Sequence, residues 1–380
     1  MKLSRKNLGR VATTFLATAM LASLTAVPAF AEDKGIYEPG ESFTITKNLT
    51  VPANVLTPDV TFEFDVSAPN GPVSGTLNGM KIEAGDAGDV TMQTGADFDP
   101  ETNVDDTANA RTVSEKATFK VNLTEYEHAG VYKYTISEKN DNVEGVNYKA
   151  PSKDLYVFIQ NQTDENGDYI KDDEGNVLLE VAYTMVVEAG EDATIQENKS
   201  DSFDNDYGKD PEGDPNVFDL TLTKEITGNA ADLGDKFTFK FTVNGNVDGE
   251  KYVMLYNGNK TIITEGVEQS VELGDDDSVT IYGLSKSDSY TITEEYGDKT
   301  GYSTTATINN GENVLKNGNL DVAYGTGENE DITEAHNVVY TNSRDSAAPT
   351  GIAMDIAPYA LLVVIAAAGC FVFLRKRNED

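Results

Sequence analysis

The sequence predicts an all-β protein built from two domains in tandem. Its length of 380 residues is too great for one ordinary domain. Apolar and polar residues alternate with the two-residue period of strands through most of the chain. One set of short motifs also occurs twice in the same order, which indicates an internal repeat. Between the two ends of the chain, no stretch of about a dozen residues has the apolar period of a helix.

Turn-forming clusters separate the alternating segments. Strands are predicted at residues 42–46, 60–66, 117–123, 131–137, 236–243 and 290–294. Clusters of Gly, Asn, Asp and Pro predict turns at residues 69–72, 165–168, 173–176 and 309–311. Residues 206–216 include two Pro, two Gly and many charged residues, which is typical of a linker. We therefore expect domains at residues 32–208 and 217–345, joined by a linker at 209–216.

The first 31 residues have the three parts of a secretory signal peptide. A positively charged start is followed by the apolar residues 11–26 and by the small-residue cleavage motif Ala29-Phe30-Ala31. A permanent membrane anchor is the weaker interpretation, because the apolar run is short and ends at Pro28. The chain is therefore expected to be exported, with the mature protein starting at Glu32.

The C-terminal segment, residues 346–380, combines a short motif, an apolar span and a basic tail. Residues 356–374 carry no charge and would form a helix of about 28 Å, roughly the thickness of a bilayer core. The motif Pro349-Thr350-Gly351 precedes this span. This order resembles the sorting signal of Gram-positive wall proteins, which implies that a sortase cleaves between Thr350 and Gly351. The motif departs from the usual Leu-Pro-x-Thr-Gly, because it has no Leu and no spacer before Thr350. The alternative is a simple single-pass membrane protein.

The composition excludes several kinds of function. A formal charge of −36 excludes a non-specific nucleic-acid binder, because the protein would repel phosphate. Two His and one Cys argue against a Cys/His zinc site, and neither a metal nor a cofactor is expected. Processing at both ends would remove Cys370, so the mature chain could form no disulfide. An extracellular protein without disulfides needs another source of stability.

Three residue types recur in the same order in both halves of the chain. The matching segments are Thr44-Ile45-Thr46-Lys47 and Thr221-Leu222-Thr223-Lys224, Tyr134-Thr135-Ile136-Ser137-Glu138 and Tyr290-Thr291-Ile292-Thr293-Glu294, and Phe203-Asp204-Asn205 and Tyr340-Thr341-Asn342. In each half an aromatic strand motif also starts 14 residues after the lysine, at Thr61 and at Thr238. Three matched positions and one matched spacing are unlikely by chance.

The repeated lysine and glutamate share strand faces with apolar residues. Buried ions are costly unless they are paired or neutralised. Burial lowers the pKa of a lysine and raises that of a glutamate, so the pair can share one proton and become neutral. A neutral amine can attack a neighbouring carboxamide, while the acid polarises the carbonyl and shuttles the proton that lets ammonia leave. The pattern predicts one Lys–Asn isopeptide bond in each domain. The alternative is a set of exposed edge residues or simple ion pairs.

These motifs together resemble the isopeptide-crosslinked backbone pilins of Gram-positive bacteria, of the streptococcal T-antigen type. The resemblance covers essentially the whole mature chain. It runs through Thr-Lys47-Asn-Leu, Tyr-Thr-Ile-Ser-Glu138, Phe-Asp-Asn205, Lys224 with Gly228-Asn229, Tyr-Thr-Ile-Thr-Glu294, Thr-Asn342-Ser-Arg-Asp and Ala-Pro-Thr-Gly. The resemblance implies two immunoglobulin-like β-sandwiches of the CnaB (inverse Ig) type, flanked by the signal peptide and the transmembrane sorting helix. It further implies the bonds Lys47–Asn205, with Glu138 as catalytic residue, and Lys224–Asn342, with Glu294. Glu295 is expected to face the other way.

The resemblance also implies partners. A sortase would join Thr350 of one subunit to a lysine of the next copy in a covalent head-to-tail polymer. The pilin motif Tyr-Pro-Lys is absent, and Lys199, six residues before Asn205, occupies the place of the acceptor in the T-antigen type. An ordinary solvated lysine is the alternative reading of Lys199.

The expected function is that of a structural pilus subunit that supports adhesion, a substrate of sortase and not an enzyme beyond its single-turnover crosslinking. The expected location is the cell wall and surface of a Gram-positive bacterium, after a transiently membrane-anchored precursor. Further expected partners are peptidoglycan or a basal pilin, and a host surface or matrix ligand. A wall-anchored monomeric adhesin built of the same domains is the alternative.

Overall fold

A computed structural model describes residues 36–37, 40–101, 110–149, 152–246, 249–295, 301–315, 320–326 and 330–346. The predicted signal peptide, the Pro349-Thr350-Gly351 motif and the apolar span at 356–374 lie outside these residues. The helices within the described ranges are two short 3₁₀ turns, η1 (Leu123–Glu125) and η2 (Gln196–Asn198). Over the same ranges, no helix is long and apolar enough to cross a membrane. Strands make up most of the remainder, which confirms the all-β prediction.

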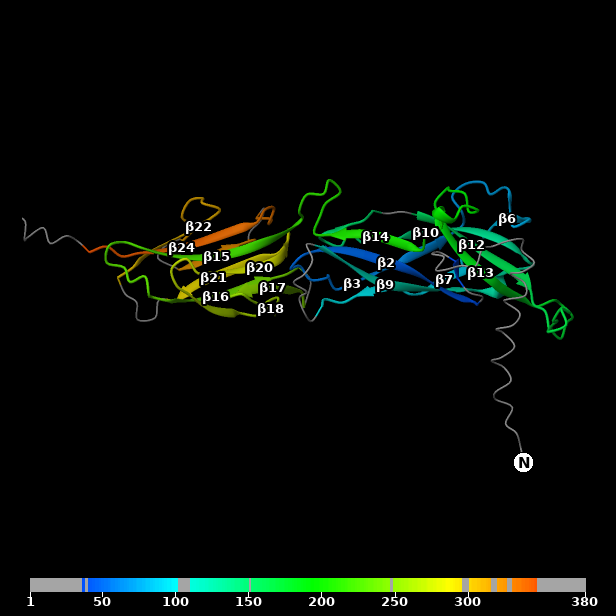
Figure 1. Ribbon diagram of the computed structural model, residues 1–380, viewed down its shortest axis with the longest axis horizontal. Coiled ribbons are helices and arrows are strands. Elements are labelled where there is room, and N and C mark those ends of the chain that lie inside the picture. Colours follow the sequence, from blue (N-terminus) through cyan, green and yellow to red (C-terminus); the bar gives the residue numbers. More distant parts are fainter. Residues whose placement is uncertain are drawn as a thin grey trace, which may run out of the picture.

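Two sheets form the N-terminal domain (Figure 1). In order across the first sheet, the strands are β1 (Ile36–Tyr37), β13 (Leu179–Glu188), β12 (Ser152–Asn161), β10 (Gly130–Glu138), β6 (Met80–Ala84) and β5 (Thr76–Leu77), with β4 (Phe64–Ser67) also paired to β10. The second sheet consists of β11 (Val146–Asn147), β14 (Ser202–Tyr207), β2 (Ser42–Pro52), β9 (Ala110–Val121) and β7 (Val90–Thr94). A separate ladder joins β3 (Val60–Phe62) to β8 (Ala96–Phe98).

The C-terminal domain also has two sheets. One consists of β18 (Asn259–Thr264), β17 (Lys251–Tyr256), β20 (Ser278–Ser285), β15 (Val217–Thr227), β24 (His336–Ser343) and β22 (Ser303–Ile308). The other consists of β19 (Gln269–Leu273), β16 (Phe237–Asn244), β21 (Ser289–Glu295) and β23 (Asp321–Tyr324). The two domains lie end to end along the long axis of the molecule (Figure 1). This arrangement confirms the predicted tandem β-sandwich class.

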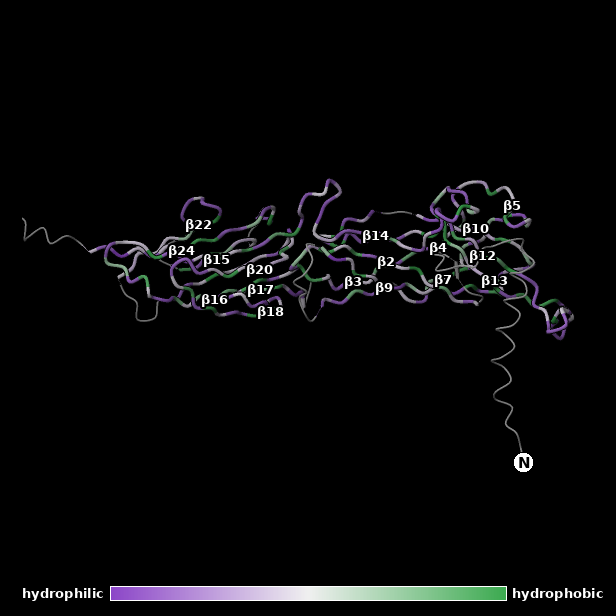
Figure 2. Tube along the Cα trace, in the orientation of Figure 1, coloured by the Kyte–Doolittle hydropathy of each residue, from purple (hydrophilic) through white to green (hydrophobic). Residues whose placement is uncertain are grey.

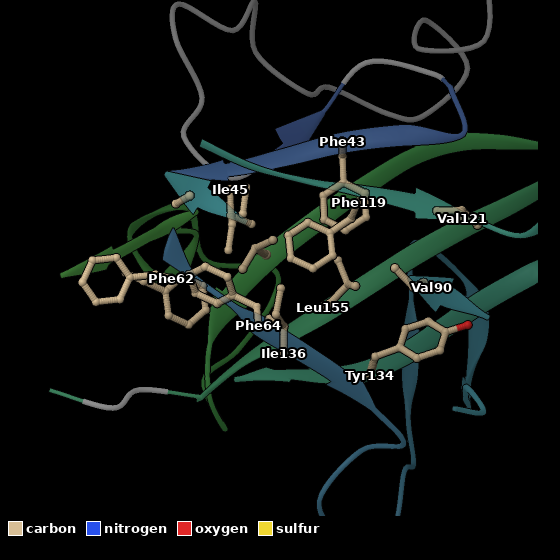
Figure 3. Packing of buried hydrophobic residues seen from close by; sticks show 14 of the residues in the cluster. Phe43, Ile45, Phe62, Phe64, Val90, Phe119, Val121, Tyr134, Ile136 and Leu155 are labelled. Atoms are coloured by element: carbon tan, nitrogen blue, oxygen red, sulfur yellow. The ribbon is translucent and has the colours of Figure 1, made fainter. Parts of the chain in front are cut away.

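Alternating burial along the strands produces each core. In β2 every second side chain is buried. Figure 2 shows how the hydropathy of the residues changes along the trace. The inward side chains pack between the two sheets, because apolar surface is stabilised by removal from water. Figure 3 shows Phe43 and Phe119 stacked in the N-terminal core, with ring centroids 5.2 Å apart. Lys47 lies on this same inward face of β2 and is fully buried.

One predicted strand is divided in two. Residues 60–66 were expected to be continuous, but β3 ends at Phe62 and β4 begins at Phe64. The two pieces pair with different partners, β8 and β10, so the ladder changes at Glu63. The carbonyl of Glu63 accepts a hydrogen bond from the Lys139 backbone N–H at 2.9 Å. Alternation is a local signal and does not specify where a strand exchanges one partner for another.

In each domain the first long strand lies beside the last strand and parallel to it. β2 pairs with β14, and β15 pairs with β24. Parallel neighbours cannot be joined by a tight turn, so the chain completes the rest of the sandwich between them. Residues that are more than a hundred positions apart in the sequence are thereby brought together.

The predicted linker is a hydrogen-bonded hairpin. Lys209 and Pro215 form an isolated bridge, and the segment projects between β14 and β15 in Figure 1. Directly after it, Val217 packs against the N-terminal core. Across the junction, Glu144 Oε1 accepts a hydrogen bond from the Ser287 backbone N–H at 2.8 Å. The two domains are therefore joined by side-chain contacts as well as by the chain.

Candidate crosslinking sites

The first site combines side chains from both sheets of the N-terminal domain. Lys47 on β2 lies opposite Phe203 of β14, and Asn205 lies two residues further along β14. Because the strand period is two, Asn205 shares the inward face with Phe203. Glu138 comes from the end of β10 in the opposing sheet. The side chains of all three residues are buried.

The carboxylate of Glu138 lies between the amine and the amide nitrogen. Lys47 Nζ is 2.8 Å from Glu138 Oε1 and 2.9 Å from Oε2. Asn205 Nδ2 donates a hydrogen bond to Glu138 Oε1 at 2.8 Å. The backbone N–H of Lys149 donates to Asn205 Oδ1 at 3.1 Å. One carboxyl group can thus take a proton from the amine and deliver it to the amide nitrogen.

The second site repeats this arrangement in the C-terminal domain. Lys224 on β15 lies opposite Tyr340 of β24, so Asn342 is again two residues beyond the partner of the lysine. Glu294 comes from β21 in the opposing sheet. Its Oε1 is 3.2 Å from Lys224 Nζ and accepts a hydrogen bond from Asn342 Nδ2 at 2.9 Å. The hydroxyl of Thr304, on β22, donates to Asn342 Oδ1 at 2.5 Å.

Burial shifts both members of each ion pair toward their neutral forms. Loss of hydration lowers the pKa of Lys47 to about 8, and the charge of Glu138 offsets only part of this effect. The pKa of Lys224 is lowered to about 8 in the same way beside Glu294. Burial also raises the pKa of both glutamates, against the opposing influence of the lysines. A larger fraction of these lysines is therefore in the neutral form, which can attack a carboxamide, than at an exposed lysine.

An aromatic ring also lies over each lysine amine. The positions of these rings show that the equal spacing found in the sequence does not align the two domains correctly. Lys47 Nζ lies 4.8 Å from the ring centre of Phe62, and Lys224 Nζ lies 4.6 Å from that of Phe237. These rings are 15 and 13 residues after their lysines, so the equal spacing of 14 does not mark equivalent positions. A shift of two residues leaves the alternation unchanged, which is why the sequence pattern does not reveal it.

The structure brings the six predicted lysine, glutamate and asparagine residues together as two sets of three. Glu295, one residue after Glu294, faces outward and pairs with Lys240 at 2.7 Å. Lys199 is half-buried at the end of η2, and its backbone forms a bridge to Val187 of β13. The predicted sortase residues Pro349, Thr350 and Gly351 lie outside the described residues.

Sequence reasoning missed the groups that contact the asparagine oxygens. Lys149 acts through its backbone N–H, so its residue type carries no signal. Thr304 lies in the segment Ser-Thr-Thr-Ala-Thr-Ile, where nothing distinguishes it from the other threonines. Only the pairing of β22 with β24 places Thr304 directly opposite Asn342.

Comparison with known proteins shows what each domain and the whole chain are similar to. Residues 43–208 match the model of the Spy0128-like isopeptide containing domain. Residues 218–344 match a domain of unknown function, DUF7601. A curated relative, a pilin of Streptococcus pyogenes serotype M1, is 26% identical over 354 residues, covering 89% of this chain and 92% of that protein. The chain is thus similar to a pilin over most of its length, and its N-terminal domain matches the isopeptide-containing domain family. These likenesses support a structural subunit of a pilus, and the adhesin alternative is not favoured.

Solved structures of streptococcal major pilins show the same fold as this chain. The major pilin T3.2 of Streptococcus pyogenes is 22% identical, with a TM-score of 0.53 and coverage of 82% of this chain and 100% of that chain. The major pilin T-13 of the same species is 24% identical, with a TM-score of 0.51 and the same coverage. The tandem arrangement of two β-sandwiches is therefore shared across these proteins.

Proposed function

We propose that the chain is a pilin that closes one Lys–Asn isopeptide bond in each domain, and that a sortase then joins the subunits. One observation carries the proposal: the same buried Lys, Glu and Asn constellation occurs in both domains, with the same two-residue offset along a parallel strand pair. Two unrelated ion pairs would have no reason to share that offset. Each constellation also holds amine, carboxyl and amide groups in contact, which supplies the proximity that an otherwise inert amide needs.

The reaction balances without any additional reagent. The proton shared by the pair lies on Glu138, which leaves the Lys47 amine neutral to attack Cγ of Asn205. Glu138 delivers this proton to Nδ2 and takes another from Nζ, the Cγ–Nδ2 bond breaks and ammonia leaves. The Lys149 N–H stabilises the oxygen of Asn205 as it becomes negative. Lys224, Glu294 and Asn342 react in the same way.

Each bond would close a loop of more than a hundred residues between the first long strand and the last strand of its domain. By analogy with disulfides, restricting the unfolded chain in this way contributes about 5 kcal/mol per bond in the chain-entropy model. The bonds would thus supply the stability that a mature chain without cysteine cannot obtain from disulfides.

Intact mass of the purified ectodomain tests the crosslinks. We expect a mass that is lower than the sequence mass by two ammonia molecules, because each bond releases one. Glu138→Ala and Glu294→Ala should each restore one ammonia. Glu295→Ala, which removes an outward-facing carboxylate next to the second site, is the matched control and should leave both bonds intact. A wild-type mass equal to the sequence mass would contradict the proposal.

Export, sorting and polymerisation complete the proposed function. The signal peptide would direct the membrane-anchored precursor outward, and sortase would cleave between Thr350 and Gly351. The Thr350 carbonyl would then be transferred to Lys199 of the next subunit, or to peptidoglycan or a basal pilin at the wall. The position of Lys199 supports its role as acceptor, since it lies half-exposed just before the asparagine-bearing strand β14.

A further inference from the structure

Each crosslinking site places a hydrogen-bond donor on the carbonyl oxygen of its asparagine. In the first site the donor is the Lys149 backbone N–H, 3.1 Å from Asn205 Oδ1. In the second site it is the Thr304 hydroxyl, 2.5 Å from Asn342 Oδ1. Attack of an amine on Cγ moves negative charge onto this oxygen. A donor already aimed at such an oxygen is the usual device for stabilising acyl-transfer transition states.

We propose that Thr304 is a catalytic residue of the second crosslink, and that its hydroxyl stabilises the negative charge that develops on Asn342 Oδ1. The proposal rests on the crosslinking chemistry proposed above. It assigns to the C-terminal domain a fourth participating residue, beyond the lysine, glutamate and asparagine.

The sheet fixes the position of Thr304. β22 runs antiparallel to β24, and Thr304 is the register partner of Asn342, so their side chains lie on the same inward face. Thr304 Oγ1 also lies 3.4 Å from Glu294 Oε2. A hydroxyl has a single proton to donate, and the shorter contact directs it to Asn342 Oδ1. The hydroxyl is thereby held between the acid and the electrophile.

The donor to the asparagine oxygen differs between the two domains, because different strands lie beside β14 and β24. In the C-terminal domain a complete strand, β22, flanks β24 on the side away from β15. In the N-terminal domain the corresponding neighbour of β14 is β11, which has only two residues and pairs with Asp206 and Tyr207. Lys149 lies just after β11 and presents its N–H to Asn205. A backbone donor therefore replaces the hydroxyl where there is no strand to carry one.

The Lys224–Asn342 bond can form without any chemical change in Thr304. When Lys224 Nζ bonds to Cγ of Asn342, the carbonyl electrons move to Oδ1, and they return when ammonia leaves. Glu294 Oε1 lies near both nitrogens and carries the proton between them. Thr304 keeps its own proton throughout and acts through the charge it stabilises.

Thr304→Val tests the proposal, because valine has nearly the shape of threonine without the hydroxyl. Full-length chain is produced by cell-free synthesis, quenched in denaturant at intervals and digested, and the two crosslinked peptide pairs are quantified by mass spectrometry. We expect Thr304→Val to slow the Lys224–Asn342 bond by roughly 10²–10³-fold. Thr304→Ser should stay near the wild-type rate, because it keeps the donor. The Lys47–Asn205 bond in the same molecules is the internal reference and should form at an unchanged rate.

Thr305→Val is the matched control, since Thr305 is the next residue of β22 and is exposed. It should leave both bonds at the wild-type rate. A wild-type rate for the second bond in Thr304→Val would overturn the role of Thr304, while formation of the first bond would still support the crosslink proposal. Absence of both bonds from the wild type would instead overturn the crosslink chemistry itself.

Folding can be separated from chemistry. Protease resistance of the second domain is compared with that of Asn342→Ala, which also lacks the bond. If Thr304→Val does not fold, Thr304→Cys replaces it, because a thiol is similar in size but a weaker donor. Slow crosslinking in folded Thr304→Cys would support the proposal, and a wild-type rate would contradict it.

Discussion

At the scale of the residue, each domain of this protein buries a lysine and a glutamate between two sheets. Lys47 and Glu138 have no exposed side-chain surface, and the same is true of Lys224 and Glu294. Removing two charges from water is costly, and the attraction between them need not compensate for it. An isopeptide bond would turn the lysine nitrogen into a neutral amide and leave a single titratable group. Burial of the charges activates the lysine, and the reaction would remove the free-energy cost of that burial.

In the variant Asn205→Ala, the cost of burying Lys47 should make the free energy of unfolding depend on pH. The variant keeps the Lys47–Glu138 pair but cannot form the first bond, so Lys47 still titrates. Its folded-state pKa of about 8 lies below the ordinary value of 10.5, so between these values the folded state binds fewer protons than the unfolded state. The penalty is fully present below pH 8 and is relieved as the pH rises toward 10.5. We expect the variant to gain about 3 kcal/mol over this range.

Urea unfolding of the N-terminal domain at a series of pH values from 8 to 10.5 measures this gain. Wild type should lack it, because its Lys47 nitrogen would be an amide. The double variant Lys47→Met/Asn205→Ala should lack it as well, which separates titration of Lys47 from loss of the bond. Parallel curves for Asn205→Ala and wild type would count against the predicted burial of an ionisable amine.

At the scale of the element, the parallel pairing of the first long strand with the last strand of each domain creates the sites. β2 with β14, and β15 with β24, place the lysine and asparagine on one sheet, while β10 and β21 supply the glutamate from the other. The strands of the second pair are also held together beyond their ends. Arg344 N–H donates to Thr227 O at 3.0 Å, and Ala230 N–H donates to Arg344 O at 2.9 Å.

Gly228→Ala should disrupt this connection. Gly228 has φ +99°, and a Cβ there would lie 2.4 Å from the Arg344 carbonyl oxygen, which Ala230 needs as its acceptor. A non-glycine residue in this backbone region costs about 1–3 kcal/mol before any clash is added. We expect thermal unfolding of the C-terminal domain at a lower temperature. Gly258→Ala is the control, since Gly258 has φ +73° but open space around its Cβ position. Equal losses for the two variants would show that the contact with Arg344 does not matter.

At the scale of the whole molecule, the domains lie end to end and the proposed bonds determine how a fibre bears load. With Lys199 as acceptor, the covalent path enters the subunit six residues before Asn205 and follows β14 and the hairpin into β15. At Lys224 it crosses the second bond to Asn342 and leaves toward Thr350. This covalent path does not pass through most of the strands of the C-terminal sandwich. The first bond would link β14 to β2. Tension would reach covalent bonds before it reached the hydrogen-bond ladders.

Lys199→Arg tests the polymer at this scale. Arginine keeps the charge but removes the primary amine that must accept Thr350. We expect loss of the high-mass ladder from wall extracts separated in denaturing gels, with the monomer mass showing both internal bonds. Lys171→Arg, at an exposed lysine of the same domain, should leave the ladder intact. An unchanged ladder in Lys199→Arg would assign the acceptor to a different lysine.

The sequence by itself determined the all-β class and the tandem repeat, and it predicted the six residues of the two proposed sites. Alternation with a period of two is a local property, and a lysine or glutamate on an apolar strand face is visible without knowledge of the neighbouring strand. Equal spacing after Lys47 and Lys224 was misleading, because the same period makes a shift of two residues invisible. The division of residues 60–66 at Glu63 was missed for a related reason, since it depends on a change of partner strand.

Only the tertiary structure decided which groups complete the sites. It brought Glu138 and Glu294 across from the opposing sheets, and it placed the Lys149 N–H and the Thr304 hydroxyl on the asparagine oxygens. It also folded the linker into a hairpin. These contacts depend on which strands become neighbours and in what register. Such pairings are set by the packing of the whole sandwich and not by the residues adjacent in the chain.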